Sequence, residues 1–279
     1  MCCMIILMCF MSCAGHDRRI DSNERIQSSN SLPDLWIFAV GVNYYKNLTN
    51  LRYAVINVSQ IINSLTAQKS KIYNKVHYFI LSDTANRKPS YKNIVENLAF
   101  IKQAKPDDIV VFYYSGHGDI NENGIFCLLP ADVAFDKDNR AVFQNSIPVD
   151  VLKSYLEIPS KKIIILDSCY SGAAIKTLKS PDTIIFASSR EDEQSLEWIM
   201  SIMTYSIAEG FKGAAAENKI ITAESLEKYV KERVSQLSRR IIDEKRIKAG
   251  YNPNIIIPNE QNPVVYIPEE MKGFVLGCM

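Results

Sequence analysis

The sequence predicts an α/β fold, a three-layer sandwich in which helices cover both faces of a mostly parallel central sheet. Two observations carry this prediction. Several expected strands are continuous apolar runs, which is typical of strands buried on both faces. Amphipathic helical patterns separate these runs along the chain, as the crossover connections of a parallel sheet require. A chain of 279 residues with 47% hydrophobic content is also large enough to bury such a core.

The first half of the chain supplies three of the strands. LWIFAVGVN at 35–43 is expected to be a buried strand, and apolar residues recur at helical spacing at 53–68. KVHYFILSD at 75–83 predicts the second strand, and 90–103 predicts the second helix. The third strand, DIVVFYYSGHG at 108–118, is rich in β-branched and aromatic residues and ends in a histidine between two glycines.

The second half continues the same alternation. GIFCLLP at 124–130 predicts a short returning strand, and VDVLKSYLEI at 149–158 predicts a helix. KKIIILDS and DTIIFASS predict the fourth and fifth main strands, at 161–168 and 182–189. Two later segments have the spacing of helices that pack on a core, 200–215 and 222–246.

Charge and cysteine content exclude several classes of protein. The chain has 32 basic and 31 acidic side chains, so it has no global positive field of the kind that collects nucleic acid, and we expect no nucleic-acid partner. Four of the seven cysteines lie within the first 13 residues. The other three, Cys127, Cys169 and Cys278, form no CxxC pair, so neither a metal site nor a disulfide framework is expected.

The first residues, MCCMIILMCFMSCAG, form an apolar stretch of signal-peptide size that is too short to span a membrane. Its end resembles a bacterial lipoprotein cleavage box, in which Cys13 becomes the lipidated N-terminus, although no Lys or Arg precedes the apolar run. We expect an exported, membrane-anchored lipoprotein; an uncleaved anchor and a misassigned start are the alternatives. The expected organisation is a leader at 1–13, a flexible polar tether at 14–34, a domain at 35–257 and a C-terminal tail at 258–279.

Two motifs at strand ends carry candidate chemistry, because functional groups gather beyond the carboxyl ends of parallel strands. They are YYSGHG, with His117, and IIILDSCYSG, with Cys169, 52 positions later. A thiolate is a nucleophile, and a nearby imidazole can take its proton and pass it to a leaving amine, while the Gly118 N–H could donate to an oxyanion. Taken alone, each residue is more often a small buried thiol or a hydrogen-bonded polar side chain. A histidine about 50 residues before the cysteine is, however, typical of caspases.

The sequence around these motifs resembles the caspase, metacaspase and paracaspase group of cysteine peptidases, in particular its bacterial members. FAVGVNYYKNLTNLRYAVINVSQI resembles the first strand and helix of that group, and FASSREDEQSLE resembles the strand and loop after its nucleophile. The resemblance spans roughly 35–257. It implies a caspase-like fold and hydrolysis of peptide or protein substrates through an acyl-enzyme, with Cys169 as nucleophile and His117 as general acid and base. It also implies an oxyanion hole made by the N–H groups of Gly118 and Cys169.

The resemblance further suggests which residues bind substrate. Asp167 matches the acid of the primary specificity pocket in metacaspases, which implies cleavage after Arg or Lys; a turn or cap role is the alternative. Asn57 stands where a second acid is expected, so this acid is replaced by a neutral amide, and Ser188 is the third expected binding residue. The loop that follows contains four acids that would either restore negative potential or form a solvated surface: Glu191, Asp192, Glu193 and Glu197.

The resemblance raises the question of calcium, which several metacaspases bind through aspartates. Asp132 has a plausible position, but Asn145, Ser146 and Lys176 stand where other acids are expected, so we expect no cofactor and no calcium requirement. The segment at 173–182 is too short for a cleavable linker, which favours a single-chain enzyme. We expect a monomer.

Two alternatives to a peptidase remain. A caspase-like domain can lose its activity and serve as a scaffold or binding module. A nucleotide-binding domain is disfavoured, because no phosphate-binding glycine motif follows the first strand.

Overall fold

The computed structural model describes residues 31–135, 141–142, 145–193, 195, 201–249 and 260–279. The leader, Cys13 and nearly all of the expected tether lie outside these residues. Leu32 to Met279 belong to one compact unit. Within the described residues, no helix combines the length and the apolar character that a membrane span needs.

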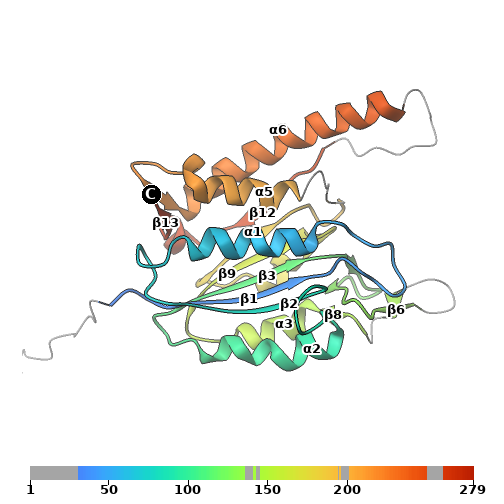
Figure 1. Ribbon diagram of the computed structural model, residues 1–279, viewed down its shortest axis with the longest axis horizontal. Coiled ribbons are helices and arrows are strands. Elements are labelled where there is room, and N and C mark those ends of the chain that lie inside the picture. Colours follow the sequence, from blue (N-terminus) through green and yellow to red (C-terminus); the bar gives the residue numbers. More distant parts are fainter. Residues whose placement is uncertain (1–30, 136–140, 143–144, 194, 196–200, 250–259) are drawn as a thin grey trace, which may run out of the picture. The chain divides into compact units, whose positions relative to one another are not determined.

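The centre of this unit is a six-stranded sheet (Figure 1). Five of its strands are parallel, and the sixth is antiparallel at one edge. This confirms the predicted α/β class with a mostly parallel sheet. In spatial order the strands are β12 (Val264–Tyr266), β10 (Thr183–Ala187), β9 (Lys161–Asp167), β3 (Ile109–Ser115), β1 (Leu35–Gly41) and β2 (Val76–Ser82).

Helices cover both faces of the sheet (Figure 1). One face carries α1 (Ala54–Thr66), α5 (Ile202–Glu209) and α6 (Ala223–Ala249). The other carries α2 (Tyr91–Asn97), η1 (Leu98–Gln103), α3 (Val149–Leu156) and α4 (Ile175–Leu178). The alternation of side chains along a strand divides the core between the two faces. In β1, for example, Leu35 and Ile37 pack in the core on the face that α1, α5 and α6 cover. Phe38 and Val40 pack in the core on the opposite face.

Smaller elements surround the sheet. β4 (Gly118–Ile120), β5 (Phe126–Leu128) and β8 (Ile147–Pro148) form an antiparallel sheet beyond β3. The remaining strands form two pairs, β6 (Ala134–Phe135) with β7 (Ala141–Val142), and β11 (Ile220–Thr222) with β13 (Val275–Cys278). The short helical turns are η3 (Ser171–Ala174), η4 (Gly210–Ala214) and η5 (Glu269–Met271).

Two segments differ from the sequence expectations. The expected helix at 90–103 divides into α2 and the tighter turns of η1, and it begins where the Ser90 side chain accepts a hydrogen bond from Asn93 N–H. The expected tail at 258–279 contributes two strands: β12 extends the central sheet, and β13 pairs with β11. β12 pairs with β10 at the edge of the sheet, and this pairing was not predicted by the short apolar run of the segment.

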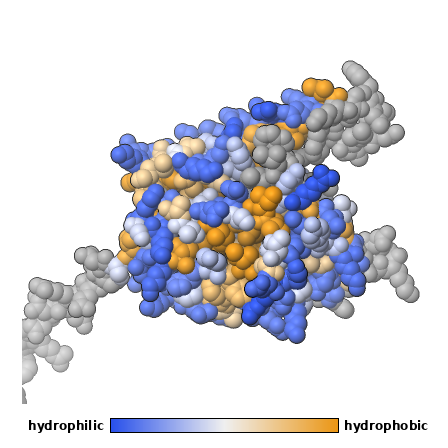
Figure 2. Space-filling model, viewed as in Figure 1, coloured by the Kyte–Doolittle hydropathy of each residue, from blue (hydrophilic) through white to orange (hydrophobic). Residues whose placement is uncertain are grey.

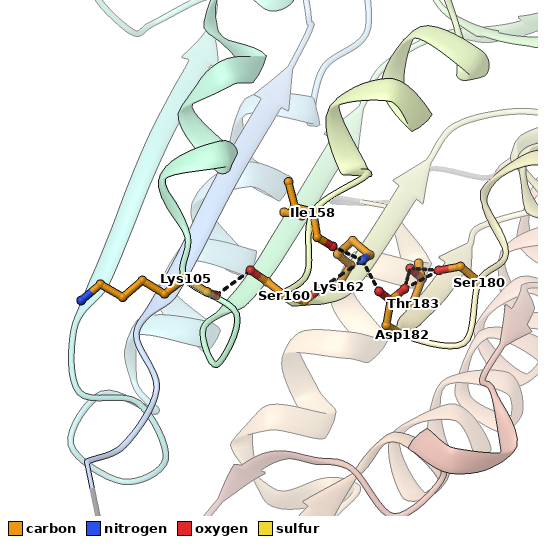
Figure 3. A network of polar contacts seen from close by, with 7 residues as sticks. All are labelled: Lys105, Ile158, Ser160, Lys162, Ser180, Asp182 and Thr183. Atoms are coloured by element: carbon orange, nitrogen blue, oxygen red, sulfur yellow. Dashed lines mark hydrogen bonds and ion pairs between the residues drawn. The ribbon is translucent and has the colours of Figure 1, made fainter. Parts of the chain in front are cut away.

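At the amino ends of β9 and β10, Lys162 is the centre of a polar network (Figure 3). Its side chain is only 4% exposed, and its Nζ donates to Ile158 O and Ser160 O at 3.0 Å and to Asp182 Oδ2 at 2.6 Å. Three acceptors satisfy the three N–H groups of the ammonium, which is what allows a lysine to be buried here. The network joins the starts of the two strands at the end of the sheet opposite the two candidate motifs.

The surface seen in Figure 2 has apolar residues gathered near its middle and hydrophilic residues around them. β2 forms one edge of the sheet; Tyr78 is exposed, Leu81 and Ser82 are buried, and its other residues are partly buried. In α1, Ile56 is exposed, whereas its neighbour Asn57 is fully buried.

Candidate active site

The sheet places the two candidate catalytic residues on neighbouring strands. β3 and β9 are parallel, and their last paired residues are Ser115 and Asp167. His117 and Cys169 each lie two residues beyond this pair. Neighbouring strands are about 4.8 Å apart, so both side chains leave the same edge of the sheet side by side. The sequence left open whether the two strands were neighbours or were separated by another strand.

A backbone carbonyl fixes the state of the His117 ring. Nε2 lies 2.8 Å from Thr49 O, and a carbonyl can only accept, so Nε2 carries the proton and Nδ1 is left with its lone pair. Burial lowers the pKa of His117 from its ordinary value of 6.5, although the hydrogen bond to Thr49 opposes this. The imidazole is therefore neutral near pH 7, with Nδ1 able to act as a base.

Two tyrosines hold the backbone of His117. Its N–H donates to Tyr45 OH at 2.7 Å, and the two rings are 4.7 Å apart. The Tyr114 hydroxyl donates to His117 O at 2.7 Å and to Leu129 O at 2.8 Å. A Cβ on Gly116 would lie 2.6 Å from the Tyr114 hydroxyl and 2.7 Å from that of Tyr45, so the motif needs glycine here.

The turn after β9 presents Cys169, whose side chain is partly exposed. Tyr170 follows in the left-handed region, with φ of 60°, and the chain then enters η3. Ser195 N–H donates to Cys169 Sγ at 3.4 Å. The loop after β10 therefore reaches the candidate nucleophile.

The direction of the Gly118 N–H, the expected oxyanion donor, follows from its place in β4. Leu129 N–H donates to His117 O, and the ladder between β4 and β5 continues with Gly118 opposite Leu128. In an antiparallel ladder this alternation turns the Gly118 N–H away from β5. A Cβ on Gly118 would lie 2.8 Å from Ser168 Oγ, so its backbone packs against the residue before Cys169.

Asp167 is only 5% exposed, at the end of β9. Its Oδ1 accepts from Ser201 Oγ at 2.6 Å, and its Oδ2 accepts from the hydroxyl of Thr204, which in turn accepts from the Tyr113 hydroxyl at 2.7 Å. Burial raises the pKa of the Asp167 carboxyl, and the hydrogen bonds from these hydroxyls work against that rise. These hydroxyl donors are neutral, so they satisfy the oxygens without supplying a countercharge.

The other two expected binding residues lie behind the site. Asn57 Nδ2 donates to Ser115 Oγ at 3.0 Å, and its Oδ1 accepts from Ser201 N–H at 3.2 Å. Ser201 thus joins Asn57 and Asp167 into one cluster. Ser188 is fully buried, and its hydroxyl accepts from Ser168 N–H at 3.0 Å and donates to Ser168 O at 2.9 Å. The structure therefore places Ser188 beneath the nucleophile turn, which it supports.

The acids of the loop after β10 have different environments. Glu191 and Asp192 are exposed, Glu193 binds backbone and side-chain groups of Asn262, and Glu197 lies outside the described residues. Among the residues that the structure describes, no group of three His, Cys, Asp or Glu side chains could hold a metal ion. Asp132, the candidate calcium ligand, accepts from Tyr91 N–H at the start of α2.

Sequence reasoning missed Tyr45, Thr49 and Tyr114, which hold His117, and Ser201 and Thr204, which bind Asp167. A weak signal existed for Tyr114, because it directly precedes the SGHG motif. Thr49 acts through its backbone, so its side-chain identity carries no signal.

Comparisons with known proteins give a consistent result. A family model described as "Caspase domain" matches residues 36–268. Metacaspase-1 of Meyerozyma guilliermondii is 29% identical over 154 residues, which are 49% of this chain and 35% of that protein. Metacaspase-2 of Trypanosoma brucei brucei is 31% identical over 147 residues, which are 48% of this chain and 40% of that protein. The alignments therefore span less than half the length of these relatives.

Solved structures extend the likeness to the fold. Caspase-1 from Spodoptera frugiperda superposes with a TM-score of 0.56 over 89% of this chain and 91% of its own, at 12% identity. At this identity the match concerns the architecture alone, and it agrees with the mostly parallel sheet covered by helices on both faces.

Proposed function

The chain belongs to the caspase-domain family, as its motifs predicted, and from this premise we propose that it is a cysteine-type endopeptidase acting on peptides or proteins. The observation that carries the proposal is the register of β3 and β9, which brings His117 and Cys169 to one edge of the sheet on adjacent strands. The fixed tautomer of His117 supports it further, because a base needs an available lone pair.

The proposed reaction proceeds through a thioester. The thiol of Cys169 gives its proton to Nδ1 of His117, and the thiolate sulfur attacks the carbonyl carbon of the scissile peptide bond. The N–H groups of Gly118 and Cys169 donate to the oxyanion that forms. His117 then protonates the leaving amine as the C–N bond breaks. Water, deprotonated by the same imidazole, hydrolyses the thioester and restores the thiol.

We propose that cleavage follows Arg or Lys. Asp167 is a buried carboxylate whose hydroxyl donors, Ser201 and Thr204, are neutral and leave its charge uncompensated. A guanidinium or ammonium group from the substrate would supply the missing countercharge, and would do so more favourably than another hydroxyl because buried charges require pairing. Asn57 at the second acid position supplies a neutral amide to the same cluster, which makes a single carboxylate responsible for the preference.

Three further properties belong to the proposal. The enzyme needs neither a cofactor nor calcium, which is supported by the role of Asp132 at the start of α2. It acts as a single chain, supported by the short connection between β9 and β10, and as a monomer. It is exported and anchored through lipidated Cys13, supported by the apolar leader and its small-residue end.

A burst experiment separates the peptidase from the catalytically silent scaffold. A fluorogenic Arg ester is mixed rapidly with the full-length chain, and the first turnover is followed. We expect rapid release approaching one equivalent per chain and no burst from Cys169→Ala, because only an enzyme that forms an acyl intermediate releases product in this way. Folded wild-type protein that shows neither burst nor turnover would favour the scaffold.

A further inference from the structure

Two contacts connect the loop after β10 to the nucleophile turn. Ser195 N–H donates to Cys169 Sγ at 3.4 Å, and Tyr170 N–H donates to Glu193 O at 2.9 Å. Tyr170 has a φ of 60°, a conformation that costs a residue with a side chain about 1–2 kcal/mol and persists only where its surroundings enforce it. The backbone of Glu193 and Ser195 therefore holds the turn on which the thiol is mounted.

The side chain of Glu193 faces away from this turn and binds the C-terminal segment. Its Oε2 accepts from the N–H groups of Asn262 and Arg190, at 3.1 and 3.2 Å, and its Oε1 accepts from Asn262 Nδ2 at 3.1 Å. The side chain is only 10% exposed. The preceding residue of the same segment, Gln261, is fully buried and donates from Nε2 to Ser188 O at 2.7 Å. Two consecutive residues of the C-terminal segment thus bind this loop at Ser188 and at Glu193.

We propose that Glu193 and Asn262 form a clamp that positions the Ser195 N–H on Cys169 Sγ and thereby sets the reactivity of the nucleophile. Glu193 is then a positioning residue, since it acts through Tyr170 and Ser195. An N–H that donates to sulfur favours the thiolate over the thiol, so a correctly placed Ser195 raises the fraction of reactive nucleophile at a given pH.

The clamp assigns Glu193 a different role from that of its acidic neighbours. Both of its carboxylate oxygens already accept hydrogen bonds from the protein, so it is poorly placed to attract a basic substrate. Asp192 differs, because its side chain is 78% exposed and it pairs with Arg190, which is itself 58% exposed, with 3.7 Å between Oδ1 and the guanidinium Nε. Asp192→Asn is therefore a matched control, on the same loop and with the same loss of charge as Glu193→Gln.

The test measures the thiol itself. Full-length wild type, Glu193→Gln, Asn262→Ala and Asp192→Asn are alkylated with iodoacetamide at a series of pH values, and modification of Cys169 is followed by mass spectrometry of its peptide. We expect the first two variants to shift the pH midpoint of alkylation upward by about one unit, with up to about tenfold slower alkylation at pH 7. Asp192→Asn should behave like wild type.

The outcomes are distinct. Asn262→Ala removes a single hydrogen bond, so it keeps the test valid if Glu193→Gln lowers the melting temperature severely. Folded variants whose alkylation midpoint equals that of wild type would overturn the clamp, even if they are less stable. The inference rests on Cys169 being the proposed nucleophile, but alkylation needs no peptide hydrolysis. A shifted midpoint in a chain that cleaves no peptide would therefore support the clamp and reject the peptidase.

Discussion

The hydroxyl of Tyr45 provides the sharpest test of how His117 is held. Tyr45→Phe keeps the ring that contacts the imidazole but removes the acceptor of His117 N–H. It also removes the hydrogen bond from Tyr45 to the hydroxyl of Tyr114. Tyr44→Phe is the matched control, because Tyr44 is the adjacent tyrosine and is 64% exposed, whereas Tyr45 is 7% exposed.

The size of the effect follows from these contacts. A buried donor left without its acceptor costs about 1–3 kcal/mol, with the lower half expected here because His117 is partly buried. The lost bond between the two hydroxyls adds about 0.5–1.5 kcal/mol. We therefore expect Tyr45→Phe to lower the free energy of unfolding by about 2–3 kcal/mol, and the exposed control to change it by less than about 0.5 kcal/mol.

We expect catalytic activity to differ between Tyr45→Phe and Tyr44→Phe in the same direction as stability. A small displacement of the His117 backbone moves Nδ1 relative to the thiol, so we expect kcat to fall roughly tenfold while KM changes little. Urea denaturation measures the stability, and hydrolysis of an Arg peptide at saturating concentration measures kcat. If Tyr45→Phe equals Tyr44→Phe in both assays, the argument that this hydroxyl positions the histidine is refuted.

Three further predictions concern other parts of the molecule. Burial lowers the pKa of His117, so the acid limb of the kcat/KM profile should have its midpoint below pH 6.5; a midpoint at or above 6.5 would contradict the assignment of this base. Gly118→Ala places a Cβ 2.7 Å from the Phe126 ring and should reduce kcat roughly 100-fold by displacing an oxyanion donor, and steady-state kinetics with kcat unchanged would rule this out. Lys162→Met should lower the free energy of unfolding by about 2 kcal/mol at pH 7 and leave kcat unchanged. This loss is smaller than that for a fully buried ion pair because the Asp182 side chain is 40% exposed. Burial raises the pKa of Asp182, but the hydrogen bonds from Lys162 and Ser180 outweigh this and lower it, so the stability difference should shrink in urea titrations as the pH falls below 3.8; a constant difference would show that the ion pair is not its source.

The main elements of the fold could be predicted because their signals are local. The apolar run at 109–115 and the similar one at 161–167 are long and continuous, and the helix α3 lies between them in the sequence. β12 could not be predicted in the same way. It has only three residues, Val264–Tyr266, and it exists because of its pairing with β10, which lies far away in the sequence.

The residues of the candidate site also differ in whether a local sequence signal marks them. His117 and Cys169 could be proposed as candidates because each follows a clear strand, with His117 between two glycines and Gly172 three residues after Cys169. The groups that hold them could not, since Thr49 acts through a carbonyl and Glu193 is read from the sequence as one of several solvated acids. Their roles come from contacts between distant loops, and these depend on strand register, which the sequence leaves undetermined.

The most direct test of the central claim is hydrolysis of matched fluorogenic peptides ending in Arg, Lys or Asp by the full-length chain, with Cys169→Ala and His117→Ala as controls and with calcium or chelator added. The account predicts release from the Arg and Lys peptides alone, unaffected by chelator, and a loss of about 1,000-fold or more in either variant. No release from any peptide by folded wild type, or equal release by Cys169→Ala, would contradict it.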